Sequence, residues 1–279
     1  MKKTLFTAVL ILLAAFMTCQ RSEQTVMLEL KYPDGQVIVW EYEQTERTEE
    51  FKNDSLWRLD EISHSGTTVE EIINKLDSTF LIKHTNQIHS KILDPKTNTY
   101  CTRDTTEYVY SLQTADGRIF WIEGGEMPDS TTLKSYKNKF KDLAAQYPSR
   151  PVSVGYTWTQ TSKVELKDGR MNDVTTSYKV RDLTKYDGHN CAIIDFKSDQ
   201  AYPIEMKLEG GKGTLEGKGS RKTRGVLYHA YDEGIIIEFD IKSDMVSELV
   251  EKSESGEAKV IVKKKSSRSY KMTEHILPE

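Results

Sequence analysis

The sequence predicts a mainly β fold: a strongly curved antiparallel β-sheet, a half-barrel meander, with one central covering α-helix at about residues 131–147. Three observations predict it. Apolar and polar residues alternate with a period of two along most of the chain, which is typical of strands with one buried and one solvated face. Asp-Gly pairs lie between these segments, and Asp-Gly is a favoured hairpin turn. One stretch has helical spacing instead.

The alternation begins near the N-terminus. Val26, Leu28 and Leu30 share one face of an extended segment, and Glu29 and Lys31 occupy the other face. The same alternation recurs in Ile38, Trp40 and Tyr42, and again in Ile235, Ile237, Phe239 and Ile241. Each of these segments is therefore expected to bury one face against a core.

Four Asp-Gly pairs mark predicted turns. They are Asp34-Gly35, Asp116-Gly117, Asp168-Gly169 and Asp187-Gly188. The clearest hairpin joins Tyr108–Thr114 to Arg118–Glu123. Residues 69–76 fit a helix or a long strand, and the Thr-rich alternation around them favours the strand. Sequential hairpins predict a meander and not the βαβ order of a nucleotide-binding fold.

The predicted helix at 131–147 divides the chain. Ser130 is its expected N-cap, and Pro148 and Pro151 forbid its continuation. Its apolar side consists of Leu133, Tyr136, Phe140, Leu143, Ala144 and Tyr147. We therefore expect one large β-rich domain over 26–279, with halves at about 26–127 and 152–276 joined by this helix.

The first residues have the layout of a bacterial export signal. Lys2 and Lys3 precede an uncharged run that is shorter than the roughly 20 apolar residues of a membrane span. Phe16-Met17-Thr18-Cys19 resembles a lipobox, and no Ala-x-Ala cleavage pattern stands near it. We expect a signal peptide at 1–18, acylated Cys19, and a lipidated tether at 19–25. The alternative is a soluble secreted protein.

Position 20 bears on the location of the lipoprotein. An Asp directly after the acylated cysteine would retain it at the inner membrane, but this position is Gln20. We therefore expect a protein of the bacterial cell envelope, attached to the outer membrane through Cys19 and facing the periplasm.

The net charge bears on nucleic-acid binding, and the cysteine content bears on a disulfide. Removal of Lys2 and Lys3 moves the formal net charge from −4 to −6, so electrostatics give no reason to bind nucleic acid. Cys101 and Cys191 could pair in an oxidising compartment, or each could be a small buried apolar residue. Both alternatives stay open.

Motifs for catalysis or cofactors do not fit. The segment Glu209–Gly225 is rich in glycine, but its spacing matches neither a dinucleotide fingerprint nor a P-loop. Its glycines are expected in strands that bend or pack closely. His84 and His89 would point to opposite faces of a strand, and the other histidines have no partner at metal-ligand spacing. No G-x-S-x-G elbow occurs. We expect no catalytic residues, no metal and no cofactor.

Aromatic residues are the remaining candidates for binding. The chain has 14 tyrosines and four tryptophans, at positions 40, 57, 121 and 158. Core packing is their default role. On the concave side of a curved sheet, Trp and Tyr can also line a groove for an apolar ligand.

Two segments resemble a known family. Tyr147–Trp158 (YPSRPVSVGYTW) is similar to the P-x-x-P-V-x-V-G-x-x-W motif of an uncharacterised Bacteroidota lipoprotein family, a domain of unknown function. The glycine pattern of Gly217–Leu227, followed by Tyr231–Glu238 (YDEGIIIE), resembles the family's glycine-rich strand and D-x-G hairpin. The resemblance covers the C-terminal half and implies structural roles for Gly155 and Trp158. More loosely, such lipoproteins are similar to the half-barrels of periplasmic lipoprotein carriers.

These observations predict a lipid-anchored, non-catalytic envelope lipoprotein that binds an apolar small molecule, a lipid or an envelope protein. One alternative is a structural subunit of an envelope complex. The other, less favoured, is a hydrolase that acts through carboxylates, which would require two acids in one cleft.

Overall fold

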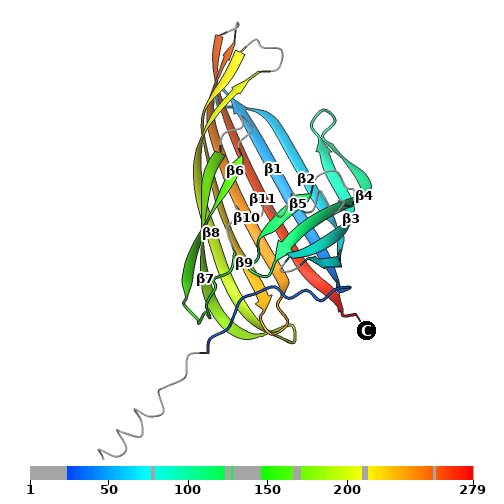
Figure 1. The fold of residues 1–279 in the computed structure, drawn as a ribbon. Coiled ribbons are helices and arrows are strands. Elements are labelled where there is room, and N and C mark those ends of the chain that lie inside the picture. Colours follow the sequence, from blue (N-terminus) through cyan, green and yellow to red (C-terminus); the bar gives the residue numbers. More distant parts are fainter. Residues whose placement is uncertain are drawn as a thin grey trace, which may run out of the picture.

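The computed structural model describes residues 24–76, 79–122, 127, 146–165, 171–208, 213–253 and 256–278. Eleven strands of this part of the chain form one antiparallel sheet (Figure 1). The first six are β1 (Val37–Lys52), β2 (Ser55–Leu76), β3 (Thr79–Asp94), β4 (Thr99–Thr114), β5 (Ile119–Ile122) and β6 (Thr157–Glu165). The others are β7 (Met171–Tyr186), β8 (His189–Lys207), β9 (Gly213–Ala230), β10 (Ile235–Ser253) and β11 (Gly256–Ile276).

The strand order makes the first and last strands neighbours at the centre of the sheet. The order is β5-β4-β3-β2-β1-β11-β10-β9-β8-β7-β6. Two meanders therefore extend in opposite directions from the β1–β11 pair and end at edge strands β5 and β6. Figure 1 shows the resulting sheet as a tall, strongly curved trough.

The predicted fold class needs a correction. The antiparallel sheet is present, but the described residues contain strands and no helix, so the central covering α-helix is wrong for this part of the chain. Of the predicted range 131–147, residues 131–145 lie outside the described residues, and Gln146 and Tyr147 lie in a bend. The described residues also contain no helix that is long and apolar enough to span a membrane.

The N-terminal segment occupies one end of the trough instead. It crosses the lower part of the trough in Figure 1, and Leu28 and Leu30 are buried. Backbone hydrogen bonds fix it at three places: Val26 exchanges bonds with Val152, Leu30 N donates to Ala115 O at 2.8 Å, and Lys31 N donates to Gly234 O at 2.8 Å. The alternation predicted for this segment is confirmed, but the bridge that Val26 forms is the isolated one to Val152, and residues 26–31 belong to none of the eleven described strands.

Most turn predictions can be compared with the structure. Asp187 and Gly188 both have positive φ and join β7 to β8, and Gly117 has φ 81° in the turn between β4 and β5. Both hairpins are confirmed. Asp34-Gly35 forms a turn before β1, while Asp168-Gly169 lies outside the described residues. Residues 69–76 belong to β2, as the Thr-rich alternation indicated.

The glycines of β9 allow close packing, as predicted. A Cβ at Gly217 would overlap the backbone carbonyl of Glu248 on β10. A Cβ at Gly225 would overlap the ring of Phe196, which lies beside it in register on β8. Aromatic rings that cover glycines of a neighbouring strand help such a strand pack in a curved sheet. The glycine-rich segment is therefore a structural feature of the wall.

Candidate functional site

The concave face of the sheet contains a cavity of about 480 Å³ near the N-terminal segment. This volume lies within the usual range for small-molecule sites, roughly 300–1,000 Å³. Its apolar and aromatic lining residues are Leu30, Tyr32, Trp40, Ile119, Trp121, Tyr147, Tyr178, Phe196, Leu227, Ile236, Phe239, Ile241 and Tyr270. Its polar lining residues are Thr68, Glu70, His84, Asn86, Gln113, Gln146 and Arg268. The lining is thus predominantly apolar with a few polar groups.

Cross-strand register brings the aromatic rings together. Tyr270 on β11 stacks between Phe239 on β10, with ring centroids 4.5 Å apart, and Tyr42 on β1, at 5.4 Å. Near the β6 edge of the sheet, Trp158 on β6 stacks on Tyr178 on β7 with centroids 5.0 Å apart. Aromatic neighbours on one face of a sheet stabilise it and leave a flat apolar surface.

A buried polar network lies on the wall formed by β2, β3 and β4. Glu70 Oε1 is 3.3 Å from His84 Nδ1, and His84 Nε2 is 2.8 Å from Ser111 Oγ. The network continues through Gln113, whose Nε2 is 3.4 Å from Ser111 Oγ, to the Tyr32 hydroxyl, which donates to Gln113 Oε1 at 3.3 Å. The order carboxylate, imidazole, hydroxyl is that of a hydrolytic triad. However, Ser111 is 0 % exposed, so its hydroxyl serves here as a fixed part of the wall.

Two polar atoms of the cavity lining have no hydrogen-bond partner among the described residues. They are Trp40 Nε1 and the Tyr147 hydroxyl, on side chains only 6 % and 5 % exposed. Burial raises the pKa of the Tyr147 hydroxyl, so it keeps its proton at neutral pH. A buried donor without an acceptor costs about 1–3 kcal/mol.

A second, more polar cavity adjoins the first one on the concave face. It has a volume of about 500 Å³ and shares Thr68, Asn86, Arg268 and Tyr270 with the apolar cavity. Its other lining residues are Tyr42, Gln44, His64, Ile88, Ser90, Ile92, Arg103, Thr105 and Glu107. The concave face therefore offers one continuous space with an apolar and a polar part.

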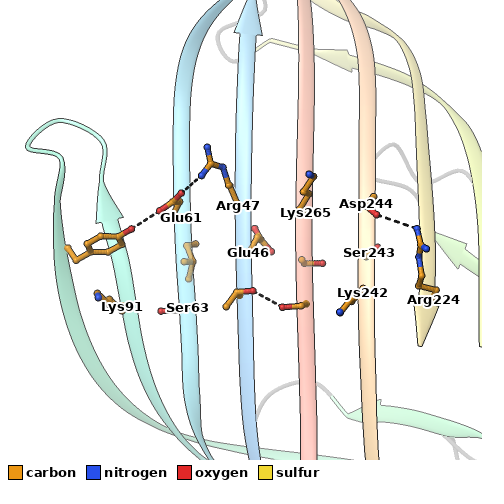
Figure 2. Close-up of a pocket in the computed structure, with 15 residues that line it drawn as sticks. Glu46, Arg47, Glu61, Ser63, Lys91, Arg224, Lys242, Ser243, Asp244 and Lys265 are labelled. Atoms are coloured by element: carbon orange, nitrogen blue, oxygen red, sulfur yellow. Dashed lines mark hydrogen bonds and ion pairs between the residues drawn. The ribbon is translucent and has the colours of Figure 1, made fainter. Parts of the chain in front are cut away.

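A broad hollow of about 720 Å³ lies mainly on the opposite, outer face (Figure 2). Arg47 and Lys265 belong there because they alternate with inward residues such as Tyr42 and Tyr270. Figure 2 shows these charged side chains in rows across the strands. Arg47 lies 2.8 Å from Glu61, and Arg224 lies 3.9 Å from Asp244. This surface is charged and partly compensated, so we place the candidate site on the concave face.

The structure describes two of the three cysteines. Cys19 lies outside the described residues. Cys101 is an exposed free thiol on β4, and Cys191 is a buried free thiol on β8, with six strands between them in the sheet order. The structure does not bring these cysteines together, and their disulfide stays a prediction. Burial raises the pKa of the Cys191 thiol to about 11.

The histidine and aromatic predictions can be compared with the structure. His84 faces inward and is 3 % exposed, whereas His89 faces outward beside Asp104, so the predicted opposite faces are confirmed. Trp40, Trp121 and the aromatic residues of β7, β8 and β10 line the cavity, while Trp57 is 70 % exposed. Sequence reasoning missed Glu70, Ser111, Tyr147 and Arg268 as parts of the concave site. The register of the strands, which was unknown, brings Glu70, Ser111 and Arg268 there, and Tyr147 comes from a bend outside the strands.

Comparisons with known proteins find similarity among solved structures only. No family model and no curated protein matches the chain. A structure of lipovitellin, described for its lipid–protein interactions, matches 89 % of this chain with 12 % identity and a TM-score of 0.46. The chain spans about a quarter, 26 %, of that lipovitellin chain.

Two proteins of Pseudomonas show weaker similarity. An outer membrane channel from Pseudomonas putida F1 matches with 8 % identity, 88 % of this chain, 97 % of its own chain and a TM-score of 0.29. OccK2 (OpdF) of Pseudomonas aeruginosa matches with 6 % identity, 86 % of this chain, 100 % of its own chain and a TM-score of 0.27.

Proposed function

We propose that this chain is a non-catalytic lipoprotein of the bacterial envelope, held at a membrane by acylated Cys19, that binds an apolar or amphipathic small molecule on its concave face. The supporting observation is the cavity of about 480 Å³ with its aromatic walls. Sheet side chains that serve only as a core fill the space between layers at high density. Here Phe196, Leu227 and Ile241 instead face a space large enough for a ligand.

The test uses the full chain, extracted gently and transferred to an amphipathic polymer in place of detergent. Native mass spectrometry would detect a co-purified lipid. Phenylnaphthylamine, an uncharged fluorophore, should gain fluorescence in the cavity and be displaced by dodecanol. A protein that carries no lipid and does not enhance the fluorescence would contradict the proposal.

A matched pair of variants tests whether the probe binds in the concave cavity. Ile241→Trp places a large ring in the cavity, and Val246→Trp places the same ring on the outer face of the same strand, where Val246 is 39 % exposed. We expect Ile241→Trp to weaken probe binding at least about tenfold, and Val246→Trp to leave it unchanged. Equal effects of both substitutions would rule out the concave cavity as the site.

A second candidate function, that of a subunit in an envelope complex, rests on exposed apolar side chains on the outer face. Leu56 is 56 % exposed, and Val246 and Val250 are 39 % and 38 % exposed. Contiguous exposed apolar surface often marks a protein interface. A stable partner that co-purifies with the wild-type chain and is lost on Leu56→Asp would support this function over ligand binding.

A further inference from the structure

The inner face changes its chemistry along a single row of residues. Residues paired in register on antiparallel strands share one face, so the row can be followed from strand to strand. From β6 to β10 the row consists of Trp158, Tyr178, Phe196, Gly225 and Ile241. From β11 to β4 it continues as Arg268, Gln44, His64, Ser90 and Arg103. At this row the wall from β6 to β10 is therefore apolar and the wall from β11 to β4 is polar, and Arg268 is the first polar residue of the row.

Arg268 is positioned to act on a ligand. It pairs with Ile241 on the apolar side and with Gln44 on the polar side, and it lines both concave cavities. Its side chain is exposed within the trough, and no carboxylate of the described residues forms an ion pair with it. Its positive charge acts on the hydroxyls of Tyr42 and Tyr270, where it opposes the rise in pKa that burial causes.

The charges that line the apolar cavity are complementary to the same kind of ligand. The carboxylate of Glu70, which lines this cavity, is engaged with His84. Trp40 Nε1 and the Tyr147 hydroxyl are buried within the wall and do not reach the cavity surface. The charged group that the lining offers to a ligand is therefore the Arg268 guanidinium, whose complement is an anionic acceptor.

We propose that the ligand of the concave face is an anionic amphiphile, whose carboxylate or phosphate group binds Arg268 and whose acyl chain lies against the apolar wall of Phe196, Leu227 and Phe239. This inference rests on the proposed function, because it assumes that the cavity binds a ligand. It specifies in addition that the ligand is negatively charged and that Arg268 binds its charged group.

The experiment compares ligands that differ only in the head group. The probe is phenylnaphthylamine bound to the full chain in an amphipathic polymer. Its displacement is measured with dodecanoate, dodecyl phosphate, dodecanol and dodecyltrimethylammonium, each at concentrations below micelle formation. We expect the better of the two anions to bind about tenfold or more tightly than dodecanol, and the cation to bind worst. The stronger anion identifies the head group as carboxylate or phosphate.

Variants then assign the preference to Arg268. Arg268→Gln should reduce anion affinity about tenfold and leave dodecanol affinity unchanged, and Arg268→Lys should keep most of the preference. Arg224→Gln is the matched control, because Arg224 is 71 % exposed on the outer face. It should change neither affinity.

The outcomes separate this inference from the proposed function. If dodecanol and the anions bind equally well, or if Arg268→Gln weakens both equally, the anionic head group is wrong while the apolar site stands. An equal loss with Arg224→Gln would show a general charge effect and would also overturn the role of Arg268. If none of the four compounds displaces the probe, both the proposed function and this inference fail.

Discussion

His229 is the most unusual single residue of the core. It is 0 % exposed, and neither ring nitrogen has a hydrogen-bond partner among the described residues. Its ring packs against Tyr147 with centroids 5.1 Å apart. Burial is the main cause that lowers its pKa from 6.5 to about 4; the nearby backbone of Glu29 opposes this shift, and the charge of Lys31 adds to it. The folded protein therefore holds this histidine neutral.

This predicts a stability that depends on pH. Between pH 6.5 and about 4 the unfolded chain binds a proton that the folded chain does not, so the free energy of unfolding falls as the pH falls. The contribution is fully present above pH 6.5 and is lost by about pH 4, and it amounts to about 3 kcal/mol.

Urea unfolding at a series of pH values checks this prediction. His229→Leu removes the titration and the two unpaired nitrogens, so its stability should fall less between pH 6.5 and 4 than that of the wild type. Parallel curves for the two proteins would show that His229 does not carry this dependence.

At the scale of elements, β9 shows how sequence and curvature are connected. Its inward positions include Gly217, Gly219 and Gly225, which lie in register with Ile204, Tyr202 and Phe196 of β8. The neighbouring side chains and carbonyls occupy the space that a Cβ would need. The glycines therefore permit the close approach of β8, β9 and β10 that forms the apolar wall.

Gly217→Ala should consequently destabilise the protein by about 2 kcal/mol, because the new methyl group meets backbone that cannot move without disturbing the sheet. Ser220→Ala, at an exposed outward position of the same strand, should change the free energy of unfolding by less than about 0.5 kcal/mol. Chemical denaturation measures both. A Gly217→Ala protein as stable as wild type would mean that the strands do not pack so closely.

The strands and hairpins could be predicted from the sequence, whereas the covering of the trough end could not. Period-two alternation and Asp-Gly turns predicted the strands and hairpins, because these signals depend on local chemistry alone. The central helix rested on local periodicity as well, but burial of the trough end depends on which segments meet in three dimensions. Leu28 and Leu30 of the N-terminal segment occupy that end, and local patterns do not encode this contact.

The sequence indicated the type of site, an aromatic groove, but not which residues meet to form it. The abundance of aromatic residues indicated a ligand groove as one possibility, but the pairing of β1 with β11 joins residues from opposite ends of the chain, such as Tyr42 and Tyr270. Arg268 and Gln44 meet through the same pairing. Sequence patterns without the register could not place a cation at the boundary of the apolar wall.

For the whole molecule, the proposed function combines a lipid anchor at Cys19 with a trough that binds a ligand. Cys19→Ala should prevent acylation and move the chain from the membrane fraction to the soluble fraction, because the acyl chains supply the membrane affinity. Cell fractionation and the intact mass of the mature protein measure this. A wild-type chain without acyl groups would contradict the anchor but leave the cavity untouched.

The most direct test of the central claim is to locate an acyl chain in the bound state. A fatty acid with a diazirine at the end of its chain is bound to the full protein and irradiated, and the labelled peptides are identified by mass spectrometry. We expect adducts on inward residues of β8, β9 and β10, such as Phe196, Leu227 and Ile241, and their loss when excess dodecanoate is present. Adducts confined to outward residues such as Val246, or labelling that dodecanoate does not reduce, would contradict it.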